Sequence, residues 1–221
     1  METLIKSAPY LLTGARQTIL LSTVTIAASL IVGLILGVLS AVGPAWLRRL
    51  LTIYVFVLRG IPVLVAMFVM YYALPAIGIK VPGVVSVTIA LVIYSTAFVT
   101  DIVRGTLLAL PRGQFEAGLS LGMSRYLAAR DVLLPQAVRP ALAPLLNTST
   151  MMIKSTAYAS VVGVWELSYA AREVVERTLQ PFEIFAGAMM IYFIICYPLS
   201  ILASRLETSS LSTQAEYLRC R

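Results

Sequence analysis

Long apolar segments alternate with short polar ones along almost the whole chain. A helix needs about 20 predominantly apolar residues to cross a bilayer, and five segments meet this requirement. They cover residues 17–41, 50–78, 83–109, 140–163 and 183–205. The first segment begins too late and is too long to be a secretory signal peptide. The pattern predicts an all-α integral membrane protein with five transmembrane helices, in which residues 1–221 form one transmembrane domain.

The composition excludes several classes of soluble protein. Hydrophobic residues make up 59% of the chain and charged residues 12%, whereas an average soluble domain is about 25% charged. A soluble enzyme, a disordered chain and a nucleic-acid-binding module are therefore excluded. The chain has no histidine and two cysteines, Cys196 and Cys220, which excludes a His/Cys metal site and a histidine-based triad. No structural disulfide is expected between these two cysteines.

Basic residues gather on one side of the predicted membrane. Because cytoplasmic loops are enriched in Lys and Arg, we assign the net charge of +7 to loops that flank the membrane. One side carries Arg48, Arg49, Arg104, Arg112, Arg125, Arg130, Arg139, Arg205, Arg219 and Arg221. The other side carries Lys6, Arg16, Lys80, Arg172 and Arg177. The N-terminus is therefore expected outside the cell and the C-terminus in the cytoplasm.

The longest polar connection, residues 111–139, lies on the predicted cytoplasmic side between the third and fourth segments. Its pattern predicts two short helices. The first lies before Gly122, and the second starts at Ser124, a favourable N-cap residue, with Asp131 near its end. From periodicity alone, this connection is either two short helices that lie against the cytoplasmic face of the membrane or an amphipathic connector that is solvated or rests on lipid head groups.

The spacing of small residues favours the first interpretation. Glu116-Ala117-Gly118 is followed after three residues by Gly122, after nine more by Val132, and then by Leu134-Pro135. This arrangement resembles the EAA loop of bacterial ABC importer permeases. Two positions depart mildly from the family pattern, because Gly118 stands for an alanine and Val132 for an isoleucine.

Other motifs resemble the polar amino acid branch of the same family. They are Arg59-Gly60-Ile61-Pro62, Asp101 to Gly105, Pro111 to Ala117, and Lys154 to Leu167. Asp101 stands where the family pattern has glutamate. Together the resemblance covers about residues 16–206.

The resemblance implies a type I ABC importer transmembrane-domain fold in a multi-pass protein of the bacterial plasma (inner) membrane. The chain would be a transport subunit and not an enzyme, with no cofactor of its own. It lacks the G-x-x-x-x-G-K-[ST] phosphate loop, so two copies of a partner ATPase would bind ATP and Mg. A second permease subunit, identical or different, and an extracytoplasmic amino acid-binding protein would complete the transporter. The residues implied in ATPase coupling are Gln114, Glu116, Ala117, Gly118, Gly122 and Pro135.

Three charged residues lie within or near the ends of the apolar segments: Arg59, Asp101 and Arg104. A charge at the centre of a membrane helix costs about 2.5–3.5 kcal/mol on insertion scales, so each should face protein or water. Asp101 and Arg104 are three residues apart and share a helical face. The three residues form either an ion-pair network that fixes helix packing or a gate that contacts a zwitterionic substrate.

Lys154 lies beyond mid-bilayer among polar residues of the fourth segment. It either contacts a substrate carboxylate in a central cavity or belongs to an interhelical hydrogen-bond seam. The third segment carries a second group of polar and aromatic side chains. The resulting candidates for the substrate pathway are Tyr94, Thr96, Thr100, Asn147, Met151, Lys154, Ser155 and Thr156.

Three rival functions are weighed against this interpretation. A secondary transporter or channel would show inverted internal repeats or discontinuous helices, and no convincing repeat is found. A membrane-bound enzyme would need nucleophile–base pairs or clustered carboxylates, but apart from Glu183, the first residue of the fifth segment, Asp101 is the only carboxylate within a predicted span. An exporter could use the same coupling loop without a binding protein. Neither the transported amino acid nor the choice between homodimer and heterodimer follows from the sequence.

Overall fold

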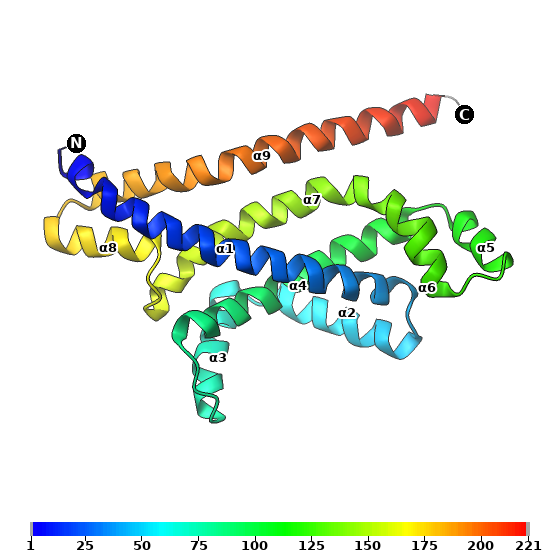
Figure 1. Ribbon diagram of the computed structural model, residues 1–221, viewed down its shortest axis with the longest axis horizontal. Coiled ribbons are helices and arrows are strands. Elements are labelled where there is room, and N and C mark those ends of the chain that lie inside the picture. The colour runs from blue at the N-terminus through cyan, green and yellow to red at the C-terminus, as the bar shows by residue number, and fades with distance from the viewer. Residues whose placement is uncertain (1, 220–221) are drawn as a thin grey trace. The chain divides into compact units, whose positions relative to one another are not determined.

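The computed structural model describes the backbone of residues 2–219, and the side chains of these residues except Arg112 and residues 209–219. Cys220 and Arg221 therefore lie outside the described residues. All regular elements in the described part are helical (Figure 1). They are α1 (Glu2–Val42), α2 (Ala45–Gly60), α3 (Val63–Ala76), α4 (Gly83–Ala109), α5 (Arg112–Ser120), α6 (Arg125–Ala128), the π-helix η1 (Ala129–Leu133), α7 (Leu134–Ser155), the 3-10 helix η2 (Thr156–Val162), α8 (Leu167–Thr178) and α9 (Pro181–Arg219).

Three single helices in the described part are long and apolar enough to cross a membrane, namely α1, α4 and residues 181–208 of α9. The expected second span is not one continuous helix, because α2 and α3 meet at a bend of 106°. Proline lacks an N–H donor and disfavours a helical conformation in the residue before it, so Pro62 ends the run that begins at Ala45. Counted as one bent span, α2 and α3 bring the number to four.

The predicted segment 140–163 does not meet the same criteria. Its helix α7 begins earlier, at Leu134, and changes to the 3-10 helix η2 at Thr156. A polar run from Asn147 to Thr150 lowers its apolar character. That this segment spans the membrane stays a prediction.

The chain divides into two compact units, each of which has its own apolar core. Unit 1 contains residues 1–28, 61–94 and 149–198. One part of its core joins α1, α8 and α9 through Leu11, Leu167 and Ile184, which have no exposed surface. A second part joins α1, α3, α4 and η2 around Met67 and Leu91, which are also fully buried.

Unit 2 contains residues 29–60, 95–148 and 199–221. Its core joins α1, α4, η1 and α7. Gly33 and Gly37 let α1 approach α4 closely, because a Cβ added at either glycine would lie 2.5 Å from Val99 or Val103. Small residues spaced by four allow such close helix packing in membranes. The contact includes a buried hydrogen bond of 3.1 Å between the hydroxyls of Ser29 and Ser95.

The two short helices of the 111–139 connection are present as α5 and α6. Ser124 caps α6, since its hydroxyl accepts a hydrogen bond of 3.2 Å from the N–H of Leu127. The expected end of this second helix near Asp131 is wrong. The backbone stays helical through η1 and continues into α7, because residues 125–134 contain neither glycine nor proline to stop it.

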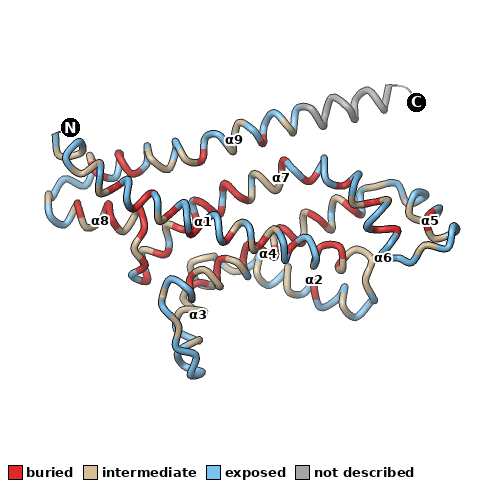
Figure 2. The backbone as a smooth tube through the Cα atoms, viewed as in Figure 1, coloured by how far each residue is buried: buried red, intermediate tan, exposed pale blue. Residues whose placement is uncertain are grey.

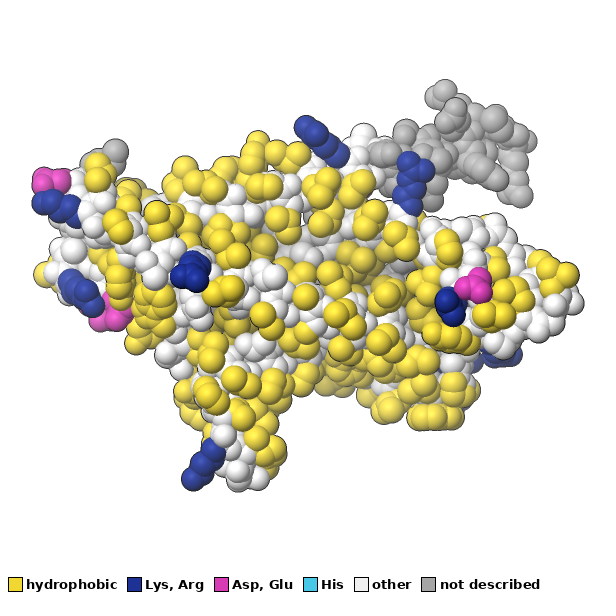
Figure 3. Space-filling view, viewed as in Figure 1, with side chains coloured by type: hydrophobic (Ala, Val, Ile, Leu, Met, Phe, Trp, Pro, Cys, Tyr) yellow, Lys and Arg dark blue, Asp and Glu magenta, His cyan; other side chains and the backbone are white. Residues whose placement is uncertain are grey.

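Large hydrophobic side chains are exposed along several helices, as expected of a protein whose solvent is lipid. Figure 3 shows hydrophobic side chains over most of the visible face, with charged groups in a few separate places. In α9, buried and exposed positions alternate along unit 1 (Figure 2). Ile184 and Ala188 face the core, whereas Phe185, Met189 and Phe193 are exposed.

Candidate functional site

Helix α5 presents most of the residues implied in ATPase coupling on its surface. Gln114, Glu116 and Ala117 are exposed. Gly118 is buried instead, because it packs against α6: a Cβ at this position would lie 3.3 Å from the Cβ of Ala128 and 3.4 Å from the Sδ of Met123. The glycine that departs from the family pattern therefore contacts its own chain. The exposed side of α5 is left to Gln114, Glu116 and Ala117.

Gly122 ends α5 by a backbone mechanism that requires glycine. Its φ is +84°, in the left-handed region that side chains with a Cβ rarely adopt. The N–H of Gly122 donates to the carbonyl of Leu119 (3.0 Å), and the N–H of Met123 donates to that of Gly118 (3.1 Å). This pair of bonds is a Schellman motif. It turns the chain sharply and leaves the Leu121 side chain 84% exposed beside the end of α5.

Pro135, the last of the coupling candidates, lies apart from α5. It is exposed in the first turn of α7, directly after the π-helix η1. The structure therefore gathers Gln114, Glu116 and Ala117 on the short helix α5, whereas Pro135 lies on the long helix α7.

The predicted three-residue charge network is a pair in the structure. The Arg59 guanidinium forms an ion pair with the Asp101 carboxylate and stacks over the Phe98 ring, 5.6 Å from its centroid. Arg104 is not part of the pair. Its Nε is buried without a hydrogen-bond partner among the described residues. Asp101 and Arg104 thus share a helix but differ in their electrostatic environment.

The substrate-pathway candidates fall into both units. In unit 1, Lys154 and Met151 are exposed on α7, whereas Tyr94, Ser155 and Thr156 are buried. The hydroxyls of Ser155 and Thr156 donate to the backbone carbonyls of Met151 and Ile153, at 2.9 and 2.7 Å. These two hydroxyls are satisfied within their own helix, which leaves the Lys154 ammonium as the exposed polar group among the candidates of unit 1.

The candidates in unit 2 are Thr96, Thr100 and Asn147. Asn147 is exposed on α7. Thr96 and Thr100 are buried in α4, and their hydroxyls have no hydrogen-bond partner within the described residues. A buried hydroxyl without a partner costs about 1–3 kcal/mol, so these two threonines have a free bonding capacity that the fold does not use.

Sequence reasoning missed a buried carboxylate. Residues 164–182, which connect the fourth and fifth predicted segments, contain α8, whose N-cap is Glu166. The Glu166 side chain has no exposed surface and accepts hydrogen bonds from the N–H of Tyr169 (2.9 Å), the Thr18 hydroxyl (3.2 Å) and the Tyr192 hydroxyl (2.7 Å). Glu166 thus joins α1, α8 and α9. The only sequence signal was a carboxylate directly before the apolar spacing of α8.

A second carboxylate supports the same helix from its exposed side. Glu173 accepts hydrogen bonds from the Tyr10 hydroxyl and, at 3.0 Å, from the indole N–H of Trp165. Tyr10 and Trp165 meet edge to face, with ring centroids 5.7 Å apart. Trp165 is therefore part of an aromatic cluster that holds α8 to α1.

The two glutamates have opposite pKa shifts because their surroundings differ. Burial raises the pKa of Glu166 above its ordinary value, and its hydrogen bonds offset part of this effect. Hydrogen bonds from Tyr10 and Trp165 lower the pKa of Glu173. Glu173 is therefore ionised at neutral pH, whereas Glu166 is poised closer to protonation.

The amino-acid sequence matches one family model over residues 29–209. The family is described as binding-protein-dependent transport system inner membrane component. The chain belongs to this family. The match covers the α1–α4 contact, the α5–α6 connection and Glu166. Of the residues described in this subsection, only those before residue 29 lie outside it. A member of this family is a transport component and not an enzyme, and it is a multi-pass protein of the inner membrane.

Characterised members of the binding-protein-dependent family resemble this chain along most of its length. The glutamine transport system permease protein GlnP of Escherichia coli strain K12 is 33% identical over 201 residues, which cover 90% of this chain and 92% of that protein. The L-cystine transport system permease protein TcyB of Bacillus subtilis strain 168 is 37% identical over 202 residues, which cover 90% and 86%.

Two solved structures share the fold of this family member. A chain from the crystal structure of an amino acid ABC transporter with histidines has a TM-score of 0.83 and 30% identity, over 93% of this chain and 96% of that chain. A chain of the MetNI methionine ABC transporter in an inward-facing conformation has a TM-score of 0.77 and 20% identity, over 90% and 95%. At 20% identity the second comparison supports the fold alone.

Proposed function

We propose that the chain is the permease subunit of an ATP-driven ABC importer for polar amino acids, in which it forms half of the translocation pathway. The single observation that carries the proposal is helix α5, whose exposed Gln114, Glu116 and Ala117 and glycine-made end form a small protruding element. Relatives named as glutamine, cystine and general amino acid permeases support the substrate class.

The assembly follows from what the chain lacks and from its family. It carries no phosphate-binding loop, so two copies of a separate ATPase would hold ATP and Mg, and this chain would hold no cofactor. A second permease, identical or different, would supply the other half of the pathway. An extracytoplasmic binding protein would deliver the amino acid. The proposed topology has five spans in a type I importer fold, with the N-terminus outside and the C-terminus in the cytoplasm.

Coupling through α5 has a direct physical basis. The small side chain of Ala117 and the glycine end at Gly122 let a partner surface approach the helix backbone closely. Glu116 can pair with a basic group of the ATPase, and Leu121 adds apolar contact area. Movement of the ATPase would be passed to α6, against which Gly118 packs, and from there to α7, with which α6 is continuous through η1. Such transmission is rigid-body gating between two states.

The substrate pathway is proposed to include Lys154 and the neighbouring candidates Tyr94, Thr96, Thr100, Asn147, Met151, Ser155 and Thr156. Every α-amino acid has a carboxylate, which an exposed ammonium attracts. The Arg59–Asp101 pair and Arg104 are proposed to stabilise helix packing or to act as a gate. A Lys154→Met variant tests the first part, and we expect it to lose uptake while it still assembles with the ATPase. Unchanged uptake would remove Lys154 from the pathway.

The coupling proposal is tested by substrate-stimulated ATP hydrolysis in reconstituted vesicles. Ala117→Arg places a long charged side chain on the exposed face of α5 without touching the core. We expect the variant to insert and keep its thermal stability but to lose stimulated hydrolysis. Thr208→Arg is the matched control, because it adds the same side chain at an exposed position of α9 and should leave stimulation intact.

A second pair of variants tests the glycine end of α5. Gly122→Asn should retain much of the stimulation because asparagine tolerates the left-handed conformation, whereas Gly122→Val should lose it. Normal stimulation in Ala117→Arg and Gly122→Val together would show that α5 does not contact the ATPase.

A further inference from the structure

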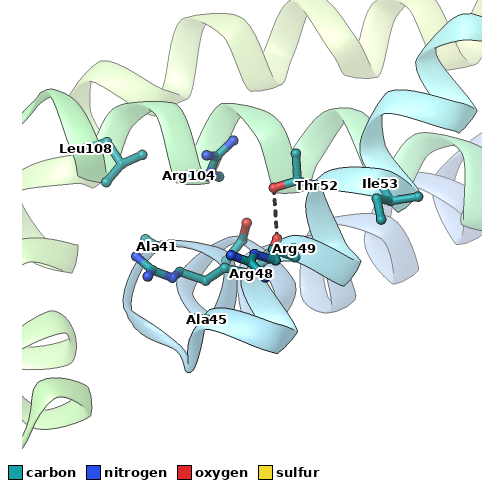
Figure 4. Close-up of a pocket in the computed structure, with 9 residues that line it drawn as sticks. Ala41, Ala45, Arg48, Arg49, Thr52, Ile53, Arg104 and Leu108 are labelled. Carbon is teal, nitrogen blue, oxygen red and sulfur yellow. Dashed lines mark hydrogen bonds between the residues drawn. The ribbon is translucent and has the colours of Figure 1, made fainter.

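Unit 2 contains a cavity of about 470 Å³ whose lining shares only Arg104 with the residues of the proposed transport mechanism. It lies between helix α2, which contributes Arg48, Arg49 and Ile53, and helix α4, which contributes Arg104 and Leu108 (Figure 4). Ser40 and Ala41 of α1 complete the wall. Three of the nine residues that line the cavity are arginines, and none is acidic.

The three arginines have no ion-pair partner among the described residues. The nearest carboxylate along α4 belongs to Asp101, which is engaged by Arg59. Arg104 also has a buried Nε without a hydrogen-bond partner. The N–H of an arginine in water donates to solvent, whereas the Nε–H of Arg104 is a buried donor that the described residues leave unused at the cavity wall. Three adjacent cations repel one another, so an anion in the cavity would relieve an electrostatic cost.

The position of the cavity along the helices places it at the edge of the hydrocarbon layer. Its wall comes from the last turns of α1 and α4, which end at Val42 and Ala109, and from the first half of α2. Trp46, 67% exposed, lies in the first turn of α2. Tryptophan and arginine at the end of an apolar helix are typical of the membrane–water interface.

Apart from the hydroxyls of Ser40 and Thr52, the rest of the lining is apolar. Leu108 is 58% exposed and Ile53 is 60% exposed. A neighbouring cavity of about 410 Å³ shares Ser40, Thr52 and Arg104 with the first and adds Phe56, which is 80% exposed. Charged groups thus lie beside an apolar surface that continues along α2. A free inorganic anion would contact the arginines alone, whereas a lipid would use both parts.

We propose that this cavity binds the phosphate group of an anionic phospholipid through Arg48, Arg49 and Arg104, with an acyl chain along Ile53, Leu108 and Phe56. Arginine suits this role because its planar group can donate two parallel hydrogen bonds to a phosphate. Basic pockets between membrane helices are a recognised physical basis for selecting anionic head groups. The site would hold α2 against α4 only in a membrane that contains such lipids.

The protein contains a built-in reporter for this site. It has two tryptophans, Trp46 and Trp165, so a Trp165→Phe background leaves Trp46 as the only indole. The protein would be reconstituted in vesicles with brominated phosphatidylglycerol or brominated phosphatidylcholine. The ratio of Trp46 quenching by the two lipids measures selectivity for the anionic head group. We expect selectivity for phosphatidylglycerol.

Four variants test the arginines. Arg104→Gln and the double variant Arg48→Gln/Arg49→Gln should each lower the selectivity, by about 5-fold per arginine removed. Arg104→Lys should fall between wild type and Arg104→Gln, because it keeps the charge and loses the planar donor pair. Arg205→Gln removes an exposed arginine of α9 that lies outside the cavity and should change nothing. The double variant keeps the test valid if Arg104→Gln fails to fold, since Arg48 and Arg49 are exposed.

Three outcomes would overturn the proposal. The first is equal quenching by the two lipids. The second is an equal loss of selectivity in Arg205→Gln and in the double variant, which would show a general surface-charge effect. The third combines two results: inorganic phosphate displaces phosphatidylglycerol, and the variants Ile53→Ser and Leu108→Ser keep the selectivity of wild type for phosphatidylglycerol. The apolar wall would then play no part in binding. That result would assign the cavity to a free anion.

Discussion

Helices α8 and α5 are both short and both lie between long apolar helices, but they are held in opposite ways. Four residues of α8 are buried, and its N-cap Glu166 binds side chains of α1 and α9. Among the α5 residues whose side chains the structure describes, only Gly118 is buried, and the end of the helix depends on the backbone bonds of Gly122. The first helix is part of a core. The second is attached to unit 2 by the Gly118 contact and by the half-buried Phe115, which packs against the core.

The difference shows which surface can serve a partner. A helix that buries one face and satisfies its caps is complete without further contacts. Helix α5 is not complete in this sense, because apolar and charged groups at its surface, such as Leu121 and Glu116, have no contact that fixes them in unit 2. Substitutions in α8 should therefore act on folding, and substitutions in α5 should act on coupling.

The largest effect is expected from Glu166→Ala. The change removes a helix N-cap, worth about 1 kcal/mol, and leaves the buried Thr18 hydroxyl without its acceptor, at about 1–3 kcal/mol. It also removes the Glu166 acceptor from the half-buried Tyr192 hydroxyl, which keeps Ser168 as a partner. We expect the free energy of unfolding to fall by about 3 kcal/mol in denaturant titrations of the purified protein. Glu116→Ala in α5 should change it by less than about 0.5 kcal/mol. Equal losses in the two variants would remove the distinction between the helices.

A smaller effect is expected from adding one methyl group at matched glycines. A Cβ at Gly14 would lie 2.9 Å from the Cβ of Ala170 and 3.0 Å from the backbone of Leu167 in α8. At Gly118 the nearest atom would be 3.3 Å away. Gly14→Ala should destabilise the protein by about 1–3 kcal/mol and Gly118→Ala by less than half of that value. Thermal unfolding of both variants measures the difference, and the reverse order would contradict it.

The smallest effect concerns pH. The pKa of Glu173 is lowered from 4.5 by its hydrogen bonds to Tyr10 and Trp165. Its contribution to stability is therefore present above pH 4.5 and is lost as the pH falls through the lowered value. Tyr10→Phe removes the main cause, so the variant should lose less stability than wild type between pH 7 and acid. Glu166 has a raised pKa, so its effect on stability as a function of pH has the opposite sign. This effect is the same in variant and wild type and cancels when the two are compared.

The sequence predicted the helices well where length and apolar character alone decide them. Helix α4 has the bounds expected for the third segment, 83–109. Pro62 did not lead to a predicted break in the second segment, because a membrane helix can tolerate proline, whereas the structure bends by 106° between α2 and α3. Helix α8 was missed because it is only 12 residues long and amphipathic, with four charged residues among its apolar ones.

The candidate site was predictable in its residues more than in its contacts. The spacing from Glu116 to Pro135 led to α5, and Ser124 was correctly identified as a cap. That Gly118 faces α6 while Gly122 makes a turn depends on backbone angles, which spacing does not reveal. The pairing of Arg59 with Asp101 and the separation of Arg104 also depend on where helix α2 lies against α4, which is a tertiary property.

The interlocking of Gly33 and Gly37 with Val99 and Val103 has a consequence for motion within unit 2. Each valine packs against a glycine that has only a hydrogen atom in place of a side chain, so a small rotation of either helix would push a valine methyl group into the opposing backbone. These parts of α1 and α4 therefore behave as a single strut. When the protein changes conformation during transport, we expect these parts of α1 and α4 to move together as one rigid body.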